Sequence, residues 1–139
     1  MNEALRFPFS PVESALGEAG FSPLLPIALT LGEHSAEVAG LLDTGAAVNV
    51  IPFRVGLSLG LDWDAQNIPL RLTGNLAQLD ARAVLLSAKV GDFTPVYLAF
   101  AWTRAENVPM ILGQTNFFME FDVCFFRSRL LFEVKRKGV

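Results

Sequence analysis

At 139 residues, the chain has room for one ordinary domain and not for two. Hydrophobic residues make up 52% of it and charged residues 18%, which excludes an intrinsically disordered chain because ample apolar surface can offset the entropy of ordering. The net charge is −3, and the basic residues are scattered apart from Lys135, Arg136 and Lys137. We therefore expect no basic face for nucleic acid.

The composition also bears on compartment and partners. The N-terminal residues lack the apolar core of a signal peptide, and apolar stretches such as 95–102 are far shorter than the roughly 20 residues of a membrane helix. We expect a cytoplasmic protein that does not enter membranes. Cys124 is the only cysteine, so no intrachain disulfide is possible, and its apolar neighbours predict that it packs as a small hydrophobe. The high apolar content of so short a chain favours burial against a partner.

The N-terminal part of the chain shows little periodicity. We interpret residues 1–23 as an irregular N-terminal arm with a short helical turn at 12–19, and residues 24–139 as the domain. From residue 24 the pattern changes, because apolar residues alternate with others through Leu25, Ile27, Leu29 and Leu31, which is the period of a strand. A turn at 32–35 and an apolar run at 36–42 complete a predicted hairpin.

The rest of the chain continues mainly as predicted strands. An apolar run follows Gly45, and four further strands end with a short one that stops at Gly113; their expected ranges are 48–53, 68–72, 81–90, 96–102 and 108–112. Three phenylalanines within residues 114–121 fall at helical spacing, which predicts one short C-terminal helix. Residues 123–126 and 130–134 read as a closing hairpin. The sum is a mostly-β domain with one or two short helices.

The segment at 41–51 carries the clearest chemistry. An apolar strand runs straight into Asp43, Thr44 and Gly45, after which apolar residues resume. This pattern predicts a carboxylate at the end of a buried strand, a hydroxyl that braces the loop, and a glycine that lets another chain approach closely. Taken alone the triplet is weak, since ordinary turns also use Asp and Gly, so its context has to decide.

That context resembles the retropepsin-like aspartic peptidases. Residues 24–51 are similar to the opening of that family, with a hairpin, an Asp-Thr-Gly-Ala loop and an apolar strand. The family's second hallmark, an apolar pair and glycine before a short helix, is matched by residues 110–113 followed by 114–121. The turn at 73–76 lies where the family has its flap. The resemblance covers about residues 24–134 and implies a closed β-barrel of the acid protease fold.

The resemblance also implies roles for particular residues. The catalytic residues would be Asp43, Thr44 and Gly45, with structural support from Ala46, Leu112 and Gly113. Substrate would be bound by the flap and by the cleft, through Thr73, Gly74, Asn75, Leu76 and Ile111. The reaction would be hydrolysis of a peptide or protein substrate, with no metal and no organic cofactor.

The number of catalytic triplets then predicts a homodimer. Two carboxylates that share a proton perform this hydrolysis, and the chain has a single Asp-Thr-Gly and no Asp-Ser-Gly. The other aspartates lack the flanking pattern and are predicted to be surface or turn residues: Asp62, Asp64, Asp80, Asp92 and Asp122. The second Asp43 would come from another copy of the chain. In the C-terminal hairpin, Phe125, Leu131 and Phe132 are candidates for intersubunit burial.

Two positions depart from the viral members of the family. Ala47 and Gln114 stand where the viral proteins have an aspartate and an arginine, whose ion pair supports the dimer interface. Their absence suggests a different interface. The predicted flap also lacks the glycine run of the viral enzymes, which leaves its substrate contacts open.

Two other functions remain open from the sequence. One is a retropepsin-like dimer that binds extended peptides without cutting them, against which the intact Asp43 triplet argues. The other is an unrelated small β-barrel for an apolar ligand, with Asp43 as a turn residue, which leaves the segment around Gly113 unexplained. The substrate, the pH optimum and any inhibitory role of the N-terminal arm stay undetermined.

Overall fold

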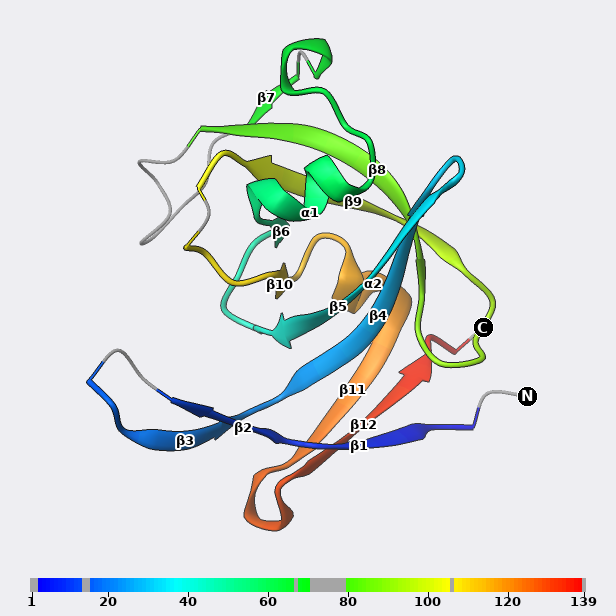
Figure 1. Cartoon of the computed structure of the whole chain (residues 1–139). Helices are drawn as coiled ribbons and strands as arrows, with labels where there is room; N and C mark the ends of the chain where they lie inside the picture. The colour runs from blue at the N-terminus through cyan, green and yellow to red at the C-terminus, as the bar shows by residue number, and fades with distance from the viewer. Residues whose placement is uncertain (1–2, 14–15, 67, 71–79, 106, 139) are drawn as a thin grey trace.

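The structure is a computed structural model, and it describes the whole chain except residues 1–2, 14–15, 67, 71–79, 106 and 139 (Figure 1). The described part is mostly β, with two short α-helices. The strands are β1 (Leu5–Pro8), β2 (Ser10–Glu13), β3 (Ala19–Ser22), β4 (Leu24–Leu31), β5 (His34–Leu42), β6 (Asn49–Ile51), β7 (Pro69–Leu70), β8 (Ala81–Lys89), β9 (Val96–Thr103), β10 (Ile111–Leu112), β11 (Phe121–Phe126) and β12 (Leu131–Arg136). The helices are α1 (Phe53–Ser58) and α2 (Phe117–Glu120), with 3-10 turns η1 (Trp63–Ala65) and η3 (Arg127–Arg129).

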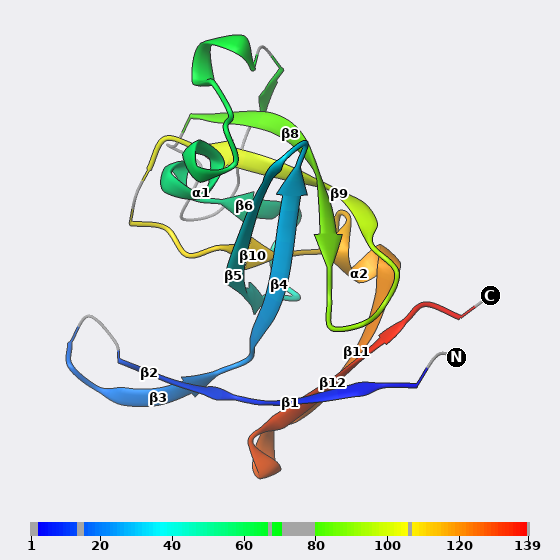
Figure 2. The same cartoon turned by 45° about the vertical axis from the view of Figure 1, so that its right-hand side comes forward.

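Six of the described strands close into a barrel, as predicted (Figure 1 and Figure 2). Their order is β4-β5-β10-β6-β9-β8, and β8 pairs back onto β4 to close the ring. The predicted first hairpin is confirmed, because β4 and β5 pair from Leu24↔Leu41 to Leu31↔His34. The barrel contributes most of the strand pairing in the described part of the chain, and it includes β5 and β6 on either side of the Asp43 loop.

The short strand β10 joins the C-terminal half of the chain to the N-terminal half by pairing with β5 and β6. It pairs parallel with the end of β5, as Ile111↔Leu41 and Leu112↔Leu42, and antiparallel with β6, as Ile111↔Val50. It therefore lies between the strand that leads into Asp43 and the strand that leaves it. Residues about 70 positions apart in the sequence become immediate neighbours.

The core fills the barrel and the space under α1. The alternation in β4 is confirmed, since Leu25, Ile27 and Leu29 are all buried. Trp102 is fully buried, and its indole Nε1–H donates to the Phe53 carbonyl at 3.1 Å. Gly56 permits this packing, because a Cβ at that position would collide with the Trp102 ring. The sequence patterns do not predict helix α1, because this contact with Trp102 is distant in the sequence.

The terminal segments form a second sheet of order β1-β12-β11, which crosses beneath the barrel in both views (Figure 1 and Figure 2). The predicted closing hairpin is confirmed by the antiparallel pairing of β11 with β12. The predicted irregular segment with a helical turn at 12–19 was wrong: β1 pairs with β12, and β2 pairs with β3. The reason is distance, since Leu5 pairs with Val134 and no local pattern announces that partner.

Two side-chain predictions in the terminal sheet also need correction. Phe132 is fully buried within its own chain, where it stacks on Phe7 at 5.4 Å between ring centroids and meets Phe9 edge-on. It is therefore not available for burial between subunits. Cys124 is exposed and not packed as a small hydrophobe, because it lies on the outer face of β11. Phe125 is 37% exposed, so it keeps the surface that an interface would need.

The basic C-terminal residues lie close to an acidic side chain. Two of the three C-terminal basic residues face one carboxylate, with Lys137 at 3.0 Å and Arg136 at 3.9 Å from Glu120. Among the described residues, none of the helices has the length and apolar character to cross a membrane.

Candidate functional site

Asp43 lies directly after β5, in a tight turn that fixes its carboxylate. Its backbone N–H donates to the Leu112 carbonyl at 3.0 Å, and its own carbonyl accepts from the Ala46 N–H at 3.1 Å. The side-chain Oδ1 accepts from the Gly45 N–H at 2.9 Å. Within the described part of the chain, Oδ2 has no hydrogen-bond partner and the side chain is half-buried. One oxygen is thus anchored by the loop, and the other is available for another molecule.

The segment around Gly113 packs directly against the loop that carries Asp43. The Gln114 N–H donates to the Ala46 carbonyl at 2.9 Å, and the Thr115 N–H donates to the Ala47 carbonyl at 2.8 Å. A Cβ on Gly113 would lie 2.6 Å from the Val48 carbonyl oxygen and 2.8 Å from that of Ala46. Only glycine therefore lets the two backbones approach this closely.

Leu112 and Ile111 support the site from within the barrel. Leu112 is fully buried against Gly40, where a Cβ would lie 2.7 Å from Leu112 Cδ1. Ile111 is 7% exposed and packs with a small cluster that includes Val50 and Ala101. Its role in substrate binding stays a prediction. The predicted flap residues Thr73, Gly74, Asn75 and Leu76 lie outside the described residues, and β7 and β8 on either side pair antiparallel.

Sequence reasoning missed Asn49, a fully buried polar residue at the start of β6. Its Oδ1 accepts from the Gly113 N–H at 2.8 Å, while its Nδ2 donates to the Ala99 carbonyl at 3.0 Å and to Asn116 Oδ1 at 3.3 Å. This amide ties the Gly113 segment to β9 and α2 in one network. A polar residue within the apolar run at 48–53 was the available signal, because a buried polar group has to be hydrogen-bonded.

Thr44 and Gln114 meet in a way that the sequence did not predict. Thr44 is exposed, and its hydroxyl has no hydrogen-bond partner among the described residues, so the expected bracing by that hydroxyl is absent there. The Thr44 carbonyl instead accepts from Gln114 Nε2 at 2.7 Å. Ala47 is exposed nearby. A neutral amide from the segment after Gly113 therefore contacts the loop that carries Asp43.

The other aspartates lie in neither the Asp43 loop nor the segment around Gly113. All five are exposed, as predicted: Asp62, Asp64, Asp80, Asp92 and Asp122. Asp62 Oδ1 accepts from the Asp64 N–H at 3.1 Å, which is an ordinary turn role. Among the described residues, no three His, Cys, Asp or Glu side chains gather where they could hold a metal ion. Among the described aspartates, Asp43 is the one whose turn also bonds to the Leu112 carbonyl next to Gly113.

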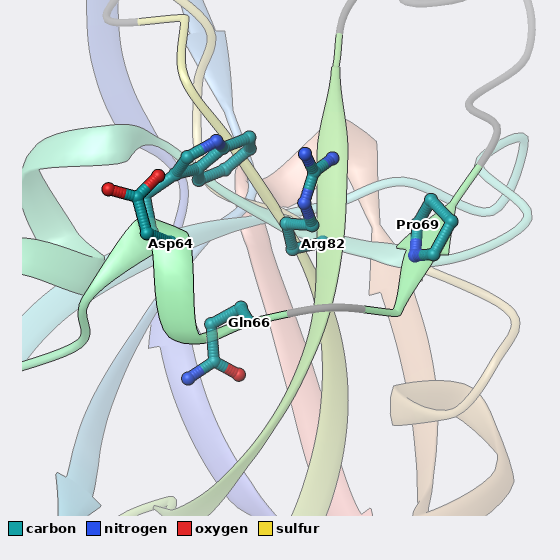
Figure 3. A pocket seen from close by; sticks show the side chains of 5 residues that line it. Asp64, Gln66, Pro69 and Arg82 are labelled. Atoms are coloured by element: carbon teal, nitrogen blue, oxygen red, sulfur yellow. The ribbon is translucent and has the colours of Figure 1, made fainter.

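A separate cavity lies beside η1 and β7. It measures about 320 Å³ and is lined by Trp63, Asp64, Gln66, Pro69 and Arg82. Figure 3 shows that the Asp64 carboxylate points away from Arg82. The Arg82 and Arg104 guanidinium groups lie 4.6 Å and 5.4 Å from the Trp63 ring centroid, close enough for cation–π attraction. None of the predicted site residues lines this cavity.

Comparisons with known proteins agree with this geometry. A family model described as aspartyl protease matches residues 27–115, which include both Asp43 and Gly113. A crystal structure described as a retropepsin-like aspartic protease from Rickettsia conorii matches with a TM-score of 0.62 at 16% identity, covering 98% of this chain and 94% of that chain. No curated protein matches the sequence. The structural likeness extends over the terminal sheet as well as the barrel.

Proposed function

Because this chain belongs to the retropepsin-like aspartyl protease family, we propose that it is an aspartic endopeptidase that acts as a homodimer, with one Asp43 from each subunit. The observation that carries this proposal is the anchored carboxylate itself. Asp43 Oδ1 is held by the Gly45 N–H at 2.9 Å, and the turn that holds it is closed by Leu112 and Ala46. Asp62 accepts a similar bond in an exposed turn, whereas the turn of Asp43 is bonded to and packed against the buried segment around Gly113.

The chemistry requires a second carboxylate. Peptide hydrolysis by carboxylates needs one group to accept a proton from water and another to donate a proton to the substrate. Two carboxylates about 3 Å apart share one proton and titrate as a unit, a behaviour known from aspartic proteases in general. In the proposed dimer, a water between the two Asp43 side chains attacks the scissile carbonyl, and no metal or cofactor takes part.

The surface around Asp43 supports a two-fold contact. Thr44, Gly45 and Ala47 are exposed at the tip of the loop, so a second copy can approach the free oxygen of Asp43. The terminal sheet offers a further contact surface, because β1 and β11 are its edges in the described chain. Phe125 on β11 is 37% exposed, and Leu131 on β12 is half-buried. We propose that these edges join the interface, while Phe132 serves the core.

The proposed substrate is an extended peptide or protein segment. By the family resemblance, it would lie between the pair of Asp43 residues and the segment at 73–76, with Ile111 beneath it. We place this activity in the cytoplasm, since a chain with one cysteine has no intrachain disulfide to gain from an oxidising compartment.

The decisive experiment is Asp43→Asn in purified protein. The amide is nearly isosteric and its Oδ1 can still accept from Gly45, so the dimer should persist by sedimentation while cleavage of a casein-type substrate falls about a thousandfold or more. The control is Asp92→Asn, an exposed turn aspartate, which should keep full activity. Substantial cleavage by the Asp43 variant would refute the assignment. If the unmodified protein bound peptide as well as the Asp43→Asn variant does but cleaved none, a non-catalytic binding dimer would be favoured.

A mixing experiment tests the shared site. With nine parts of Asp43→Asn subunits to one part of unmodified subunits, random exchange leaves about one tenth of the unmodified subunits in fully intact dimers. Activity per unmodified subunit should therefore fall about tenfold after subunit exchange. Activity that simply follows the amount of unmodified protein would mean that each subunit works alone.

A further inference from the structure

The loop that carries Asp43 is held by a side chain from the other half of the protein. Gln114 Nε2 donates to the Thr44 carbonyl at 2.7 Å, and the Gln114 backbone N–H donates to the Ala46 carbonyl at 2.9 Å. These two bonds attach one residue to both sides of Gly45, whose own N–H holds Asp43 Oδ1. Gln114 therefore acts on the peptide units that orient the carboxylate.

Both partners in the Gln114–Thr44 bond are uncharged. The nearby position 47 is an alanine, so no carboxylate is present there for a cation to pair with. A bond between an amide and a carbonyl has no group that titrates in acid, and it is far less screened by salt than an ion pair at an exposed site. An aspartate–arginine brace at these positions would weaken in the acid range where a proton-sharing carboxylate pair works, because its aspartate would become protonated there.

We propose that Gln114 is a positioning residue that holds the Asp43–Gly45 turn in its catalytic geometry through a bond that neither acid nor salt breaks. The expected effect of Gln114 on peptide cleavage rests on the proposed peptidase function, whereas its expected effect on the structure of the loop does not. Gln114 contacts neither substrate nor the reacting atoms, and it acts through the Thr44 peptide unit.

Two substitutions separate this role from simple filling of space. Gln114→Leu keeps a similar volume but removes the donor, so kcat should fall about threefold to tenfold, the range expected for one lost hydrogen bond, at every pH and with KM nearly unchanged. Gln114→Glu places a carboxylate against the Thr44 carbonyl at neutral pH and should be at least as impaired there. Below about pH 4.3, the ordinary pKa of a glutamate, its protonated carboxyl can donate to Thr44 and activity relative to the unmodified protein should recover.

The two ratios of variant to unmodified activity, plotted against pH, give the test. A recovery in acid for Gln114→Glu, with a flat ratio for Gln114→Leu, supports the proposal. Flat ratios for both variants, or a loss that appears only in KM, would overturn it. In the unmodified protein, kcat should also change little between 0.1 M and 1 M NaCl. A steep fall in kcat accompanied by faster amide exchange in residues 43–47 would contradict an uncharged Gln114–Thr44 bond.

Amide hydrogen exchange over residues 43–47 provides a readout that needs no activity. Removing the donor should speed exchange of the Gly45 and Ala46 amides about threefold to tenfold in Gln114→Leu, and exchange in the β8–β9 strands should be unchanged. Unchanged exchange in the loop would sink the positioning role even if catalysis fell. Faster loop exchange in a protein whose unmodified form cleaves no peptide would leave the positioning role standing and refute the peptidase proposal.

Discussion

The buried amide of Asn49 offers the sharpest test of how the site is assembled. Asn49→Leu keeps a similar volume but removes the acceptor of the Gly113 N–H at 2.8 Å and the donor to the Ala99 carbonyl at 3.0 Å. Each bond contributes about 1 kcal/mol net, and a buried donor left without a partner costs about 1 to 3 kcal/mol. Because the third contact, to Asn116 at 3.3 Å, is weaker, we expect a loss of about 3 kcal/mol in the free energy of unfolding.

Urea denaturation followed by tryptophan fluorescence measures this loss, since Trp102 is fully buried in the native protein. With a slope of about 1.5 to 2 kcal/mol per molar urea, the midpoint should fall by about 1.5 to 2 M. All variants should be compared at one protein concentration, because dimer formation adds to apparent stability.

The matched control is Asn107→Leu, the same substitution at an exposed loop position. Its midpoint should change by an amount equivalent to no more than about 0.5 kcal/mol. If Asn49→Leu shifted the midpoint no more than this control, the network around Gly113 would not hold the two halves of the site together. The bonds of Asn49 would then not explain why a polar residue lies inside an apolar run.

Three further predictions follow from the same geometry. Gly113→Ala should lower activity at least tenfold, because its Cβ would meet backbone oxygens at 2.6 Å and 2.8 Å, whereas Gly138→Ala, with nothing within 4 Å, should be silent. Specific activity should fall when the protein is diluted below the dimer dissociation constant, and a fully active monomer in sedimentation would end the dimer model. Phe125→Ser, which removes a ring that is 37% exposed, should raise that dissociation constant. The dependence of kcat/KM on pH should be bell-shaped, since the carboxylate pair must hold one proton, and a profile that keeps rising into alkali, or inactivation by a chelator, would contradict it.

Much of the fold could be predicted from local patterns. Alternation over 24–31 followed by a turn led to the β4–β5 hairpin, and the closing hairpin was visible in the same way. These elements depend on neighbours within about ten residues, so periodicity and turn chemistry are sufficient to find them. The sequence also showed that an Asp-Thr-Gly loop is followed, much later in the chain, by an apolar pair and a glycine. The family model that matches residues 27–115 covers both segments.

Other features were decided only by tertiary structure. The pairing of β1 with β12 joins Leu5 to Val134, and it turned a segment that looked irregular into strands. The same sheet buried Phe132 inside its own chain and left Phe125 at the surface, a distinction that hydrophobicity alone could not make. Helix α1 depended on Gly56 meeting Trp102, a contact absent from any local window.

The supports of the site belong to this second group. Asn49 and Gly113 are 64 positions apart, and Thr44 and Gln114 are 70 positions apart, so each pair meets only because β10 lies between β5 and β6. The residue types that the proposed chemistry calls for, a carboxylate followed by a hydroxyl and a glycine, lie within one short segment of sequence. The bond from the Gly45 N–H to the carboxylate is local, but the bonds that hold its turn, between Asp43 and Leu112 and between Gln114 and Thr44, join chain segments that only the folded barrel brings to within about 3 Å.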